Sequence, residues 1–364
     1  MKKNVTLVTG LWDITREDRS FEEVYIPRFK TLLKVDQPMI IFLPEHLHSI
    51  VWEVRKPENT FIKTLSLDDL KGNLFAPHWD NFKKLFDSEK WRNITGAGGW
   101  LKQSPQAMYD WYNPIVMSKM FMLNDASIYN TFDTDYFYWI DAGLNITVHE
   151  GIITDSEIYE KLPALTDPFL FLSFPYKPAG EIHGFDQAEA ERITQKPIEY
   201  VCRGGLFGGH REFIGSANAT YYSLLQTTLQ RGFMGTEETI FTIMSYIEPE
   251  NYRRSEIDVN GLIYKFYDEV KQDIAKISPI PNKKSHLRKA VYDLTKIKTN
   301  LYILTFNFPE QLIHTINSMK KVPEWLNKPN LVLLDNSTDK VAQQKNEEIA
   351  KEYDFEYIWL EGNT

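Results

Sequence analysis

An acid that directly follows an apolar run is the first feature of this sequence that could do chemistry. Residues 136–140 are five consecutive apolar or aromatic residues, a pattern typical of a strand buried on both faces of a parallel sheet. Asp141 ends the run, and Ala142 and Gly143 follow it. The carboxyl end of such a strand is where an α/β sheet opens into its ligand crevice, and small residues let a ligand approach the backbone. Asp141 is therefore either a site carboxylate or a turn residue that caps the next element.

Two adjacent acids, Glu237 and Glu238, stand at the start of a predicted helix, directly after the N-cap candidate Thr236. One interpretation makes them partners of the helix macrodipole. The other makes them carboxylates that take a proton from a substrate at the mouth of the helix. The local pattern leaves both interpretations open.

Lys119 lies among apolar neighbours in a helix predicted over residues 113–126. Asn113 suits the N-cap of this helix and Pro114 its first turn. The lysine either covers apolar surface with its stem and keeps its charge in water, or it is a cation that reaches a diphosphate.

Glycines and polar residues at two strand ends complete the candidate site. Residues 5–9 predict a first strand, and Thr9, Gly10, Trp12 and Arg16 at or just beyond its end could contact a nucleotide or form a plain strand-to-helix turn. A predicted short strand at residues 200–203 is followed by two glycine pairs. These are Gly204 and Gly205, then Gly208 and Gly209. Glycine pairs favour unusual backbone angles or close approach to a ligand, although this run matches neither the dinucleotide-binding pattern nor the P-loop.

The order of predicted elements indicates how these residues are held. Strands at residues 5–9 and 38–44 alternate with a helix at 21–35, and 50–54 and 60–65 are weaker strand candidates. This order is the signature of a βαβ unit and a parallel sheet. Further strands are predicted at 136–140 and 168–174, with helices at 155–162 and 214–229. Residues 66–112 are rich in tryptophan and predict short helices in an insertion that covers the sheet edge or shapes an acceptor pocket.

The end of the chain predicts a second, smaller unit. Residues 277–298 contain a proline-rich stretch and a basic run at 283–289, which indicates a linker. Strands at 301–306, 331–336 and 355–360 then alternate with helices at 309–320 and 340–353, a βαβαβ order. The predicted fold class is thus α/β, with a mostly parallel sheet flanked by helices and a small C-terminal βαβαβ module.

Composition narrows the function classes. The net charge of −9 argues against nucleic acid as the main partner. Cys202 is the only cysteine, so an intrachain disulfide is excluded and a reducing compartment is expected. No apolar run approaches the roughly 20 residues that span a bilayer, and the N-terminus lacks a signal-peptide pattern. We expect a cytoplasmic protein, with a peripheral contact at the inner membrane through the basic run as the alternative.

Two parts of the chain resemble known families. Residues 5–270 resemble the HtrL/YibB-type bacterial family, which is found near lipopolysaccharide genes and is related to GT-A glycosyltransferases. The residues that carry this resemblance are 8–13 with Arg16, 113–119, 138–143, 204–209 and the pair Glu237 and Glu238. Residues 301–364 resemble the opening of a family-2-like GT-A domain. By resemblance, 1–276 is a GT-A-like (Rossmann-like) glycosyltransferase domain and 299–364 a partial second module that is not catalytic alone.

The resemblance implies a glycosyltransferase that moves a sugar from a nucleotide-diphosphate donor, UDP-linked by expectation, to a bacterial surface glycan such as lipopolysaccharide or capsule. Asp141 takes the place of the metal-contacting acid of the GT-A motif, and Gly143 replaces the second acid. One carboxylate and a diphosphate could still hold Mn²⁺ or Mg²⁺. The glycine run would line the donor sugar, and Glu237 or Glu238 would take the acceptor proton. The alternatives are a non-catalytic glycan- or nucleotide-binding protein and a transferase acting on another acceptor, such as phage DNA.

Overall fold

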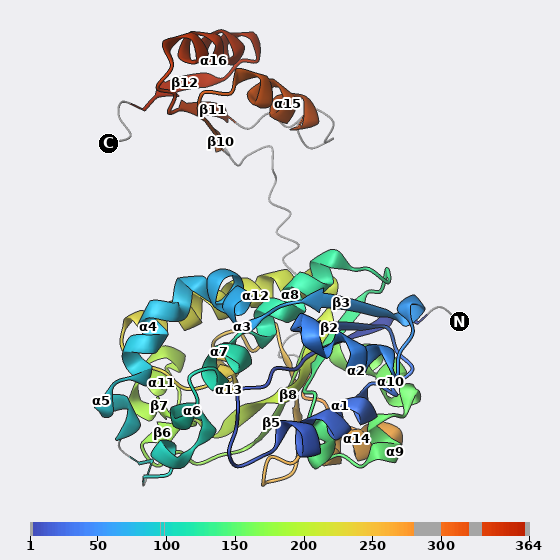
Figure 1. Ribbon diagram of the computed structural model, residues 1–364. Helices are drawn as coiled ribbons and strands as arrows, with labels where there is room; N and C mark the ends of the chain where they lie inside the picture. The colour runs from blue at the N-terminus through green and yellow to red at the C-terminus, as the bar shows by residue number, and fades with distance from the viewer. Residues whose placement is uncertain (1–2, 95, 98, 280–299, 320–329, 361–364) are drawn as a thin grey trace. The chain divides into compact units, whose positions relative to one another are not determined.

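Strands and helices alternate along most of the chain in the computed structural model (Figure 1). The structure describes residues 3–94, 96–97, 99–279, 300–319 and 330–360. The chain divides into two units, Met1–Asn282 and Lys283–Thr364. Each unit contains a sheet, and the central sheet of the first unit is mostly parallel and flanked by helices, which confirms the predicted fold class.

The described residues of the first unit form a seven-stranded sheet in the order β3-β2-β1-β4-β8-β5-β9. Its strands are β1 (Val5–Gly10), β2 (Met39–Leu43), β3 (Thr60–Thr64), β4 (Tyr136–Ile140), β5 (Phe169–Pro175), β8 (Tyr200–His210) and β9 (Arg253–Glu256). Strand β8 is antiparallel to both of its neighbours, whereas the other pairings are parallel. A separate small hairpin consists of β6 (Glu181–Ile182) and β7 (Phe185–Asp186). Because β1, β2, β3 and β4 are parallel, their carboxyl ends meet at one edge of the sheet.

Both faces of this sheet are covered, so successive strand residues enter two different cores. In β4, for example, Tyr138 packs into one core and Trp139 into the other, as the two-residue period of a strand requires. Helices on the first face are α1 (Ile26–Leu32), α2 (His48–Trp52), α9 (Glu150–Ile153), α10 (Ser156–Thr166), α11 (Gln187–Thr194) and α14 (Tyr264–Lys271). Helices on the second face are α4 (Ala76–Phe86), α5 (Glu89–Arg92), α6 (Pro105–Met108), α7 (Tyr112–Met117), α8 (Lys119–Tyr129) and α12 (Arg211–Gln230). Helix α13 (Glu237–Ile247) contributes to both cores.

The predictions for residues 50–54 and 21–35 differ from the structure. The strand predicted at residues 50–54 is wrong, because this segment is helix α2 and the turn after it. Leu47, Ile50 and Val51 are spaced as one helical face and pack together against the first core. The helix predicted at residues 21–35 begins as a π-helical turn, Phe21–Tyr25, before α1. After β4 and Gly143, the chain forms a short 3₁₀ turn, Leu144–Ile146.

The second unit is a three-stranded parallel sheet with the order β10-β11-β12. Its elements are β10 (Asn300–Thr305), α15 (Pro309–Met319), β11 (Asn330–Asp335), α16 (Lys340–Glu352) and β12 (Glu356–Trp359), which confirms the predicted βαβαβ order. Most of the predicted linker, including its basic run, lies outside the described residues. Its first residue, Ile277, pairs with Ser255 of the first unit. Within the described ranges, no helix combines the length and the apolar character that crossing a bilayer needs.

Candidate functional site

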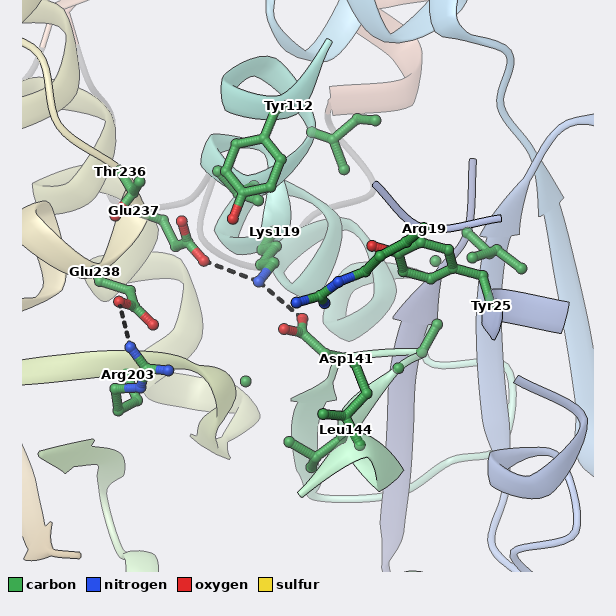
Figure 2. A pocket seen from close by; sticks show the side chains of 18 of the residues that line it. Arg19, Tyr25, Tyr112, Lys119, Asp141, Leu144, Arg203, Thr236, Glu237 and Glu238 are labelled. Atoms are coloured by element: carbon green, nitrogen blue, oxygen red, sulfur yellow. Dashed lines mark hydrogen bonds and ion pairs between the residues drawn. The ribbon is translucent and has the colours of Figure 1, made fainter. Parts of the chain in front are cut away.

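A cavity of about 540 Å³ opens beside the carboxyl ends of β1 and β4, within the size range of small-ligand sites. Its walls come from the loop after β1, helices α7 and α8, the loop after β4, strand β8 and the start of α13. Figure 2 shows charged side chains from these elements converging in the cavity. The sequence-predicted residues that line it are Gly10, Trp12, Arg16, Lys119, Asp141, Ala142, Gly143, Gly205, Glu237 and Glu238.

Asp141 reaches the cavity because it directly follows β4. The alternation of the strand puts it on the same face as Trp139, whose indole Nε1 donates a hydrogen bond to its Oδ1 at 2.7 Å. The backbone N–H of Asp141 donates to the carbonyl of Gly205 in the adjacent β8 at 3.0 Å. The side chain is 37% exposed, and Ala142 and Gly143 line the cavity beside it. The carboxylate is thus held on one side and open on the other.

Lys119 is the first residue of α8 and is 6% exposed. Its Nζ donates to Asp141 Oδ1 and Glu237 Oε1, both at 2.8 Å, and to the carbonyl of Gly204 at 3.2 Å. Burial opposes its charge, but the two carboxylates outweigh burial and hold the pKa of Lys119 well above its ordinary value. The lysine is therefore a buried cation, and the interpretation of a stem covering surface with its charge in water is wrong.

The predicted helix around Lys119 differs in detail from the observed one. It is two helices, α7 and α8, separated at Ser118. Helix α7 starts at Tyr112, with Trp111 in the N-cap position. Asn113 lies inside the helix rather than at its cap, and its side-chain amide donates to the carbonyl of Gln106 at 2.8 Å. The break at Ser118 makes Lys119 the start of a new helix facing the end of β4.

The two acids at the start of α13 have separate partners. Glu238 accepts hydrogen bonds from Arg203 Nη1 at 3.0 Å and from the backbone N–H of Gly204 at 2.9 Å, and its Oε2 lies 2.9 Å from His183 Nδ1. Burial alone would raise the pKa of Glu238, but Arg203 and His183 outweigh it and hold this pKa well below the usual range of a carboxyl. Glu238 is therefore a fixed anion.

Glu237 is 3% exposed and points toward Lys119 (Figure 2). Burial raises its pKa to about 7, with the charge of Glu238 adding to the rise and Lys119 opposing it. Thr236 precedes the helix but makes no side-chain cap bond. Both acids lie in the first turn of α13, yet each is bound to a specific side chain from another element.

A charged network therefore lies at the cavity wall, made of Lys119, Asp141, Arg203, Glu237 and Glu238. The family model HtrL_YibB, described as a bacterial protein of unknown function, matches residues 3–266. The chain belongs to the HtrL_YibB family. No curated protein matches the chain at a significant level. The HtrL_YibB match contains Lys119, Asp141, Arg203, Glu237 and Glu238, and it ends before the second unit.

The glycine run of this HtrL_YibB chain is not the loop that the sequence predicts. It forms part of β8, an eleven-residue strand. A Cβ at Gly204 would lie 2.1 Å from Glu237 Oε1, and one at Gly205 would lie 2.6 Å from Ile263 Cδ1. These two positions are therefore glycine because side chains of the cavity wall pack directly on the strand.

Gly208 and Gly209 are brought into the middle of the sheet and do not line the cavity. A Cβ at Gly208 would lie 2.1 Å from the carbonyl oxygen of Phe137, and its φ of +146° disfavours other residues. A Cβ at Gly209 would lie 2.2 Å from the carbonyl oxygen of Pro168. The structure thus gives these two glycines a packing role in place of the predicted contact with a donor.

Of the residues predicted at or after the end of β1, some line the cavity and one does not. Thr9 is fully buried and does not line the cavity. Trp12 lines it and is anchored by a hydrogen bond from its Nε1 to the carbonyl of Leu65 at 2.8 Å. Arg16 also lines it, but its guanidinium already donates to Asp18 at 2.6 and 2.9 Å and to Tyr25 Oη at 3.0 Å.

Among the cavity residues that the sequence analysis missed are Arg19, His183 and Arg203. Figure 2 shows the guanidinium of Arg19 pointing into the cavity toward Asp141. Its ion pair with Asp18 is long, at 3.8 Å. A signal existed for Arg203, which is a charge in an apolar strand directly before a glycine pair. His183 and Arg19 stand in polar stretches that give no such signal.

The tryptophan-rich insertion contributes to the cavity through a few of its residues. Trp100, Gln106 and Tyr112 line the cavity, and Trp100 is 38% exposed. Trp91, by contrast, is buried and donates to the carbonyl of Gly184 at 3.0 Å. Most of the insertion therefore packs in the core on the second face of the sheet, and a few of its side chains line the cavity.

The predicted divalent metal finds no ready-made ligand set in the ranges that the structure describes, where no three His, Cys, Asp or Glu side chains are grouped to hold an ion. Asp141 Oδ1 already accepts from Trp139 and Lys119. The ammonium of Lys119 lies 2.8 Å from both Asp141 and Glu237. These donors do not fit a resident divalent cation.

Proposed function

We propose that this HtrL_YibB chain is a glycosyltransferase that uses a nucleotide-diphosphate sugar, with UDP the first base to test, and that its acceptor is a hydroxyl of a bacterial surface glycan. The observation that carries the proposal is the contact of Lys119 with Asp141 and Glu237, which joins a strand-end acid and a helix-start acid at the wall of a cavity. Such crevices at the carboxyl ends of parallel strands are where α/β sheets bind nucleotides.

The reaction exchanges one bond for another at the sugar. The bond between the anomeric carbon and the diphosphate oxygen breaks, and a bond from the acceptor oxygen to that carbon forms. The acceptor proton goes to a carboxylate, and the nucleoside diphosphate leaves with the bonding electron pair. The protein must therefore stabilise negative charge on the leaving diphosphate and provide a proton acceptor.

The cavity has side chains for both tasks. In the proposal, Arg19 and Arg203 face the diphosphate, and Asp141 accepts hydrogen bonds from donor hydroxyls through its open Oδ2. Glu237 takes the acceptor proton. Its pKa of about 7 suits that role, because a proton acceptor works best when its pKa is near the operating pH. The exposed ring of Trp100 gives an acceptor sugar an apolar surface to stack on.

Calorimetric titration with UDP-, GDP- and CDP-linked sugars, followed by an assay of nucleoside diphosphate release with a glycan acceptor, tests the proposal. We expect binding of one donor class, and Asp141→Asn to abolish transfer while leaving thermal unfolding unchanged. Asp135→Asn is the matched control, because Asp135 precedes the opposite end of the same strand and pairs only loosely with Arg211, at 3.7 Å. Full transfer by Asp141→Asn, or binding of no donor by the wild-type protein, contradicts the proposal.

The second candidate is a protein that binds a sugar nucleotide without transferring it. The observation that favours it is the burial of Glu237, because a carboxylate that is 3% exposed meets an acceptor hydroxyl only if the site opens. Donor binding without any release of nucleoside diphosphate, over a panel of acceptors, would favour this binder. Transfer to DNA is disfavoured by the net charge of −9.

A further inference from the structure

The ammonium group of Lys119 has no unused hydrogen-bond donor. It has three N–H bonds, and three oxygens accept from it: Asp141 Oδ1, Glu237 Oε1 and the carbonyl of Gly204, at 2.8, 2.8 and 3.2 Å. The three oxygens come from three different elements, namely the end of β4, the start of α13 and β8. A positive charge surrounded by oxygens from separate elements is the arrangement in which proteins hold a cation.

Mn²⁺ and Mg²⁺ have stricter needs than an ammonium group. They take about six oxygen ligands in octahedral geometry at roughly 2.0–2.2 Å. Here Asp141 Oδ1 is already engaged by Trp139 as well as by Lys119. Electrostatic repulsion from the Lys119 charge, 2.8 Å from that oxygen, acts against any divalent ion that approaches it.

We propose that the side chain of Lys119 takes the place of a divalent cation at Asp141, so that the protein binds its nucleotide donor without a metal. The first part of the proposal, that Lys119 takes the place of the cation, concerns the protein without its donor. The second part, that the donor binds without a metal, rests on the proposed glycosyltransferase function.

The consequence for Asp141 follows from charge. A bare carboxylate at the cavity wall would repel a diphosphate, whereas one neutralised by a fixed ammonium does not. Lys119 is fixed by its three acceptors and by burial, so it costs the donor no ordering of a mobile ion. The remaining positive charge for the diphosphate then comes from arginines of the cavity, of which Arg19 points toward Asp141 (Figure 2).

Binding of Mn²⁺ alone, followed by electron paramagnetic resonance of the free ion, tests the first part without any substrate. In the wild-type protein, Asp141 should hold no Mn²⁺. Asp141→Asn should therefore remove no saturable Mn²⁺ binding. In Lys119→Ala, Asp141 and Glu237 lose their shared cation and face one space, so we expect Mn²⁺ to bind at least about tenfold more tightly than in the wild type. Adding Asp141→Asn to Lys119→Ala should abolish that gain. Lys34→Ala removes a lysine from an exposed pair with Glu150 and is the matched control, with no gain expected.

Two results would overturn the proposal. One is wild-type Mn²⁺ binding that depends on Asp141. The other is a folded Lys119→Ala protein, with a cooperative thermal transition, that gains no Mn²⁺ affinity. The wild-type measurement decides even where Lys119→Ala fails to fold. For the second part, the affinity of the wild-type protein for its donor should change less than about twofold between EDTA and Mn²⁺. A strong dependence on Mn²⁺ contradicts the metal-free inference, whereas no donor binding under either condition contradicts the proposed function and leaves the Mn²⁺ result standing.

Discussion

Replacing Glu237 by glutamine should change how the stability of the protein depends on pH. Glu237 is 3% exposed, and burial raises its pKa from 4.5 to about 7 although Lys119 lies 2.8 Å away. In the unfolded chain the same carboxyl titrates near 4.5. The folded protein therefore binds a proton on Glu237 between these two pH values, and the unfolded chain does not.

The sign of the effect follows from this difference in bound protons. Where the folded state binds more protons than the unfolded state, the free energy of unfolding falls as pH rises. The slope approaches about 1.4 kcal/mol per pH unit. Over the window from 4.5 to about 7, Glu237 removes about 3 kcal/mol of stability. Glutamine cannot titrate, so the Glu237→Gln protein lacks this slope.

Urea unfolding of both proteins at pH 5, 6, 7 and 8 gives the measurement. The second unit is identical in the two proteins and cancels in the difference. We expect the free energy of unfolding of the wild type, minus that of Glu237→Gln, to fall from pH 5 to 7 and to level off above 7. Glu238→Gln is the contrast, because the depressed pKa of Glu238 confines the loss of its own contribution to pH values below about 4.5. A change that this variant makes between pH 5 and 7 comes from Glu237, whose pKa the Glu238 charge raises. A difference for Glu237→Gln that is flat, or that rises between pH 5 and 7, would falsify the claim that burial outweighs Lys119, and with it the case for Glu237 as a proton acceptor.

Four further outcomes follow from the same contacts. The transfer rate at low substrate should rise with pH through about 7 as Glu237 loses its proton, and a pH–rate profile checks this. Arg203→Met should weaken donor binding by about tenfold or more in calorimetry, because it removes a cavity cation and unpairs Glu238. Gly208→Ala should destabilise the first unit by about 2–5 kcal/mol in urea unfolding, because its Cβ would lie 2.1 Å from a carbonyl oxygen at a φ of +146°. Arg55→Met should cost about 3–5 kcal/mol in the same assay, because buried Arg55 donates to four backbone carbonyls between 2.6 and 3.0 Å.

The sequence predicted β1, β2, β4 and β5 because these strands carry a strong apolar signal. It gave only the start of β8 and no strand at β9. Residues 136–140 and 168–174 are almost wholly apolar, which is what burial on both faces demands. The segment at 50–54 contains the β-branched residues Ile50, Val51 and Val54, which favour a strand. Their spacing with Leu47 is helical, and periodicity is the better guide there, because it describes the face that must be buried.

The site was predictable where a side chain follows a strong element and unpredictable where partners come from distant parts of the chain. Asp141 could be placed because the end of a buried strand fixes its position. The role of Lys119 could not, because its two carboxylate partners lie 22 and 118 residues along the chain. The sequence of the glycine run favours a ligand loop over a strand for a related reason. Gly208 is required by the carbonyl of Phe137 on the neighbouring strand, and no local pattern distinguishes such packing from a ligand loop.

The different protonation of the adjacent acids Glu237 and Glu238 follows from charge balance in the network. Lys119 and Arg203 carry two positive charges, against three carboxylates on Asp141, Glu237 and Glu238. One proton on a carboxylate balances the five groups. Glu238 cannot take it readily, because Arg203, an imidazole nitrogen and a backbone N–H all favour its anion. The proton goes to Glu237, because Glu237 is buried and shares Lys119 with Asp141. The pairing of Glu238 with Arg203 thus also limits the rise of the Glu237 pKa, because a screened neighbour repels less than a bare one.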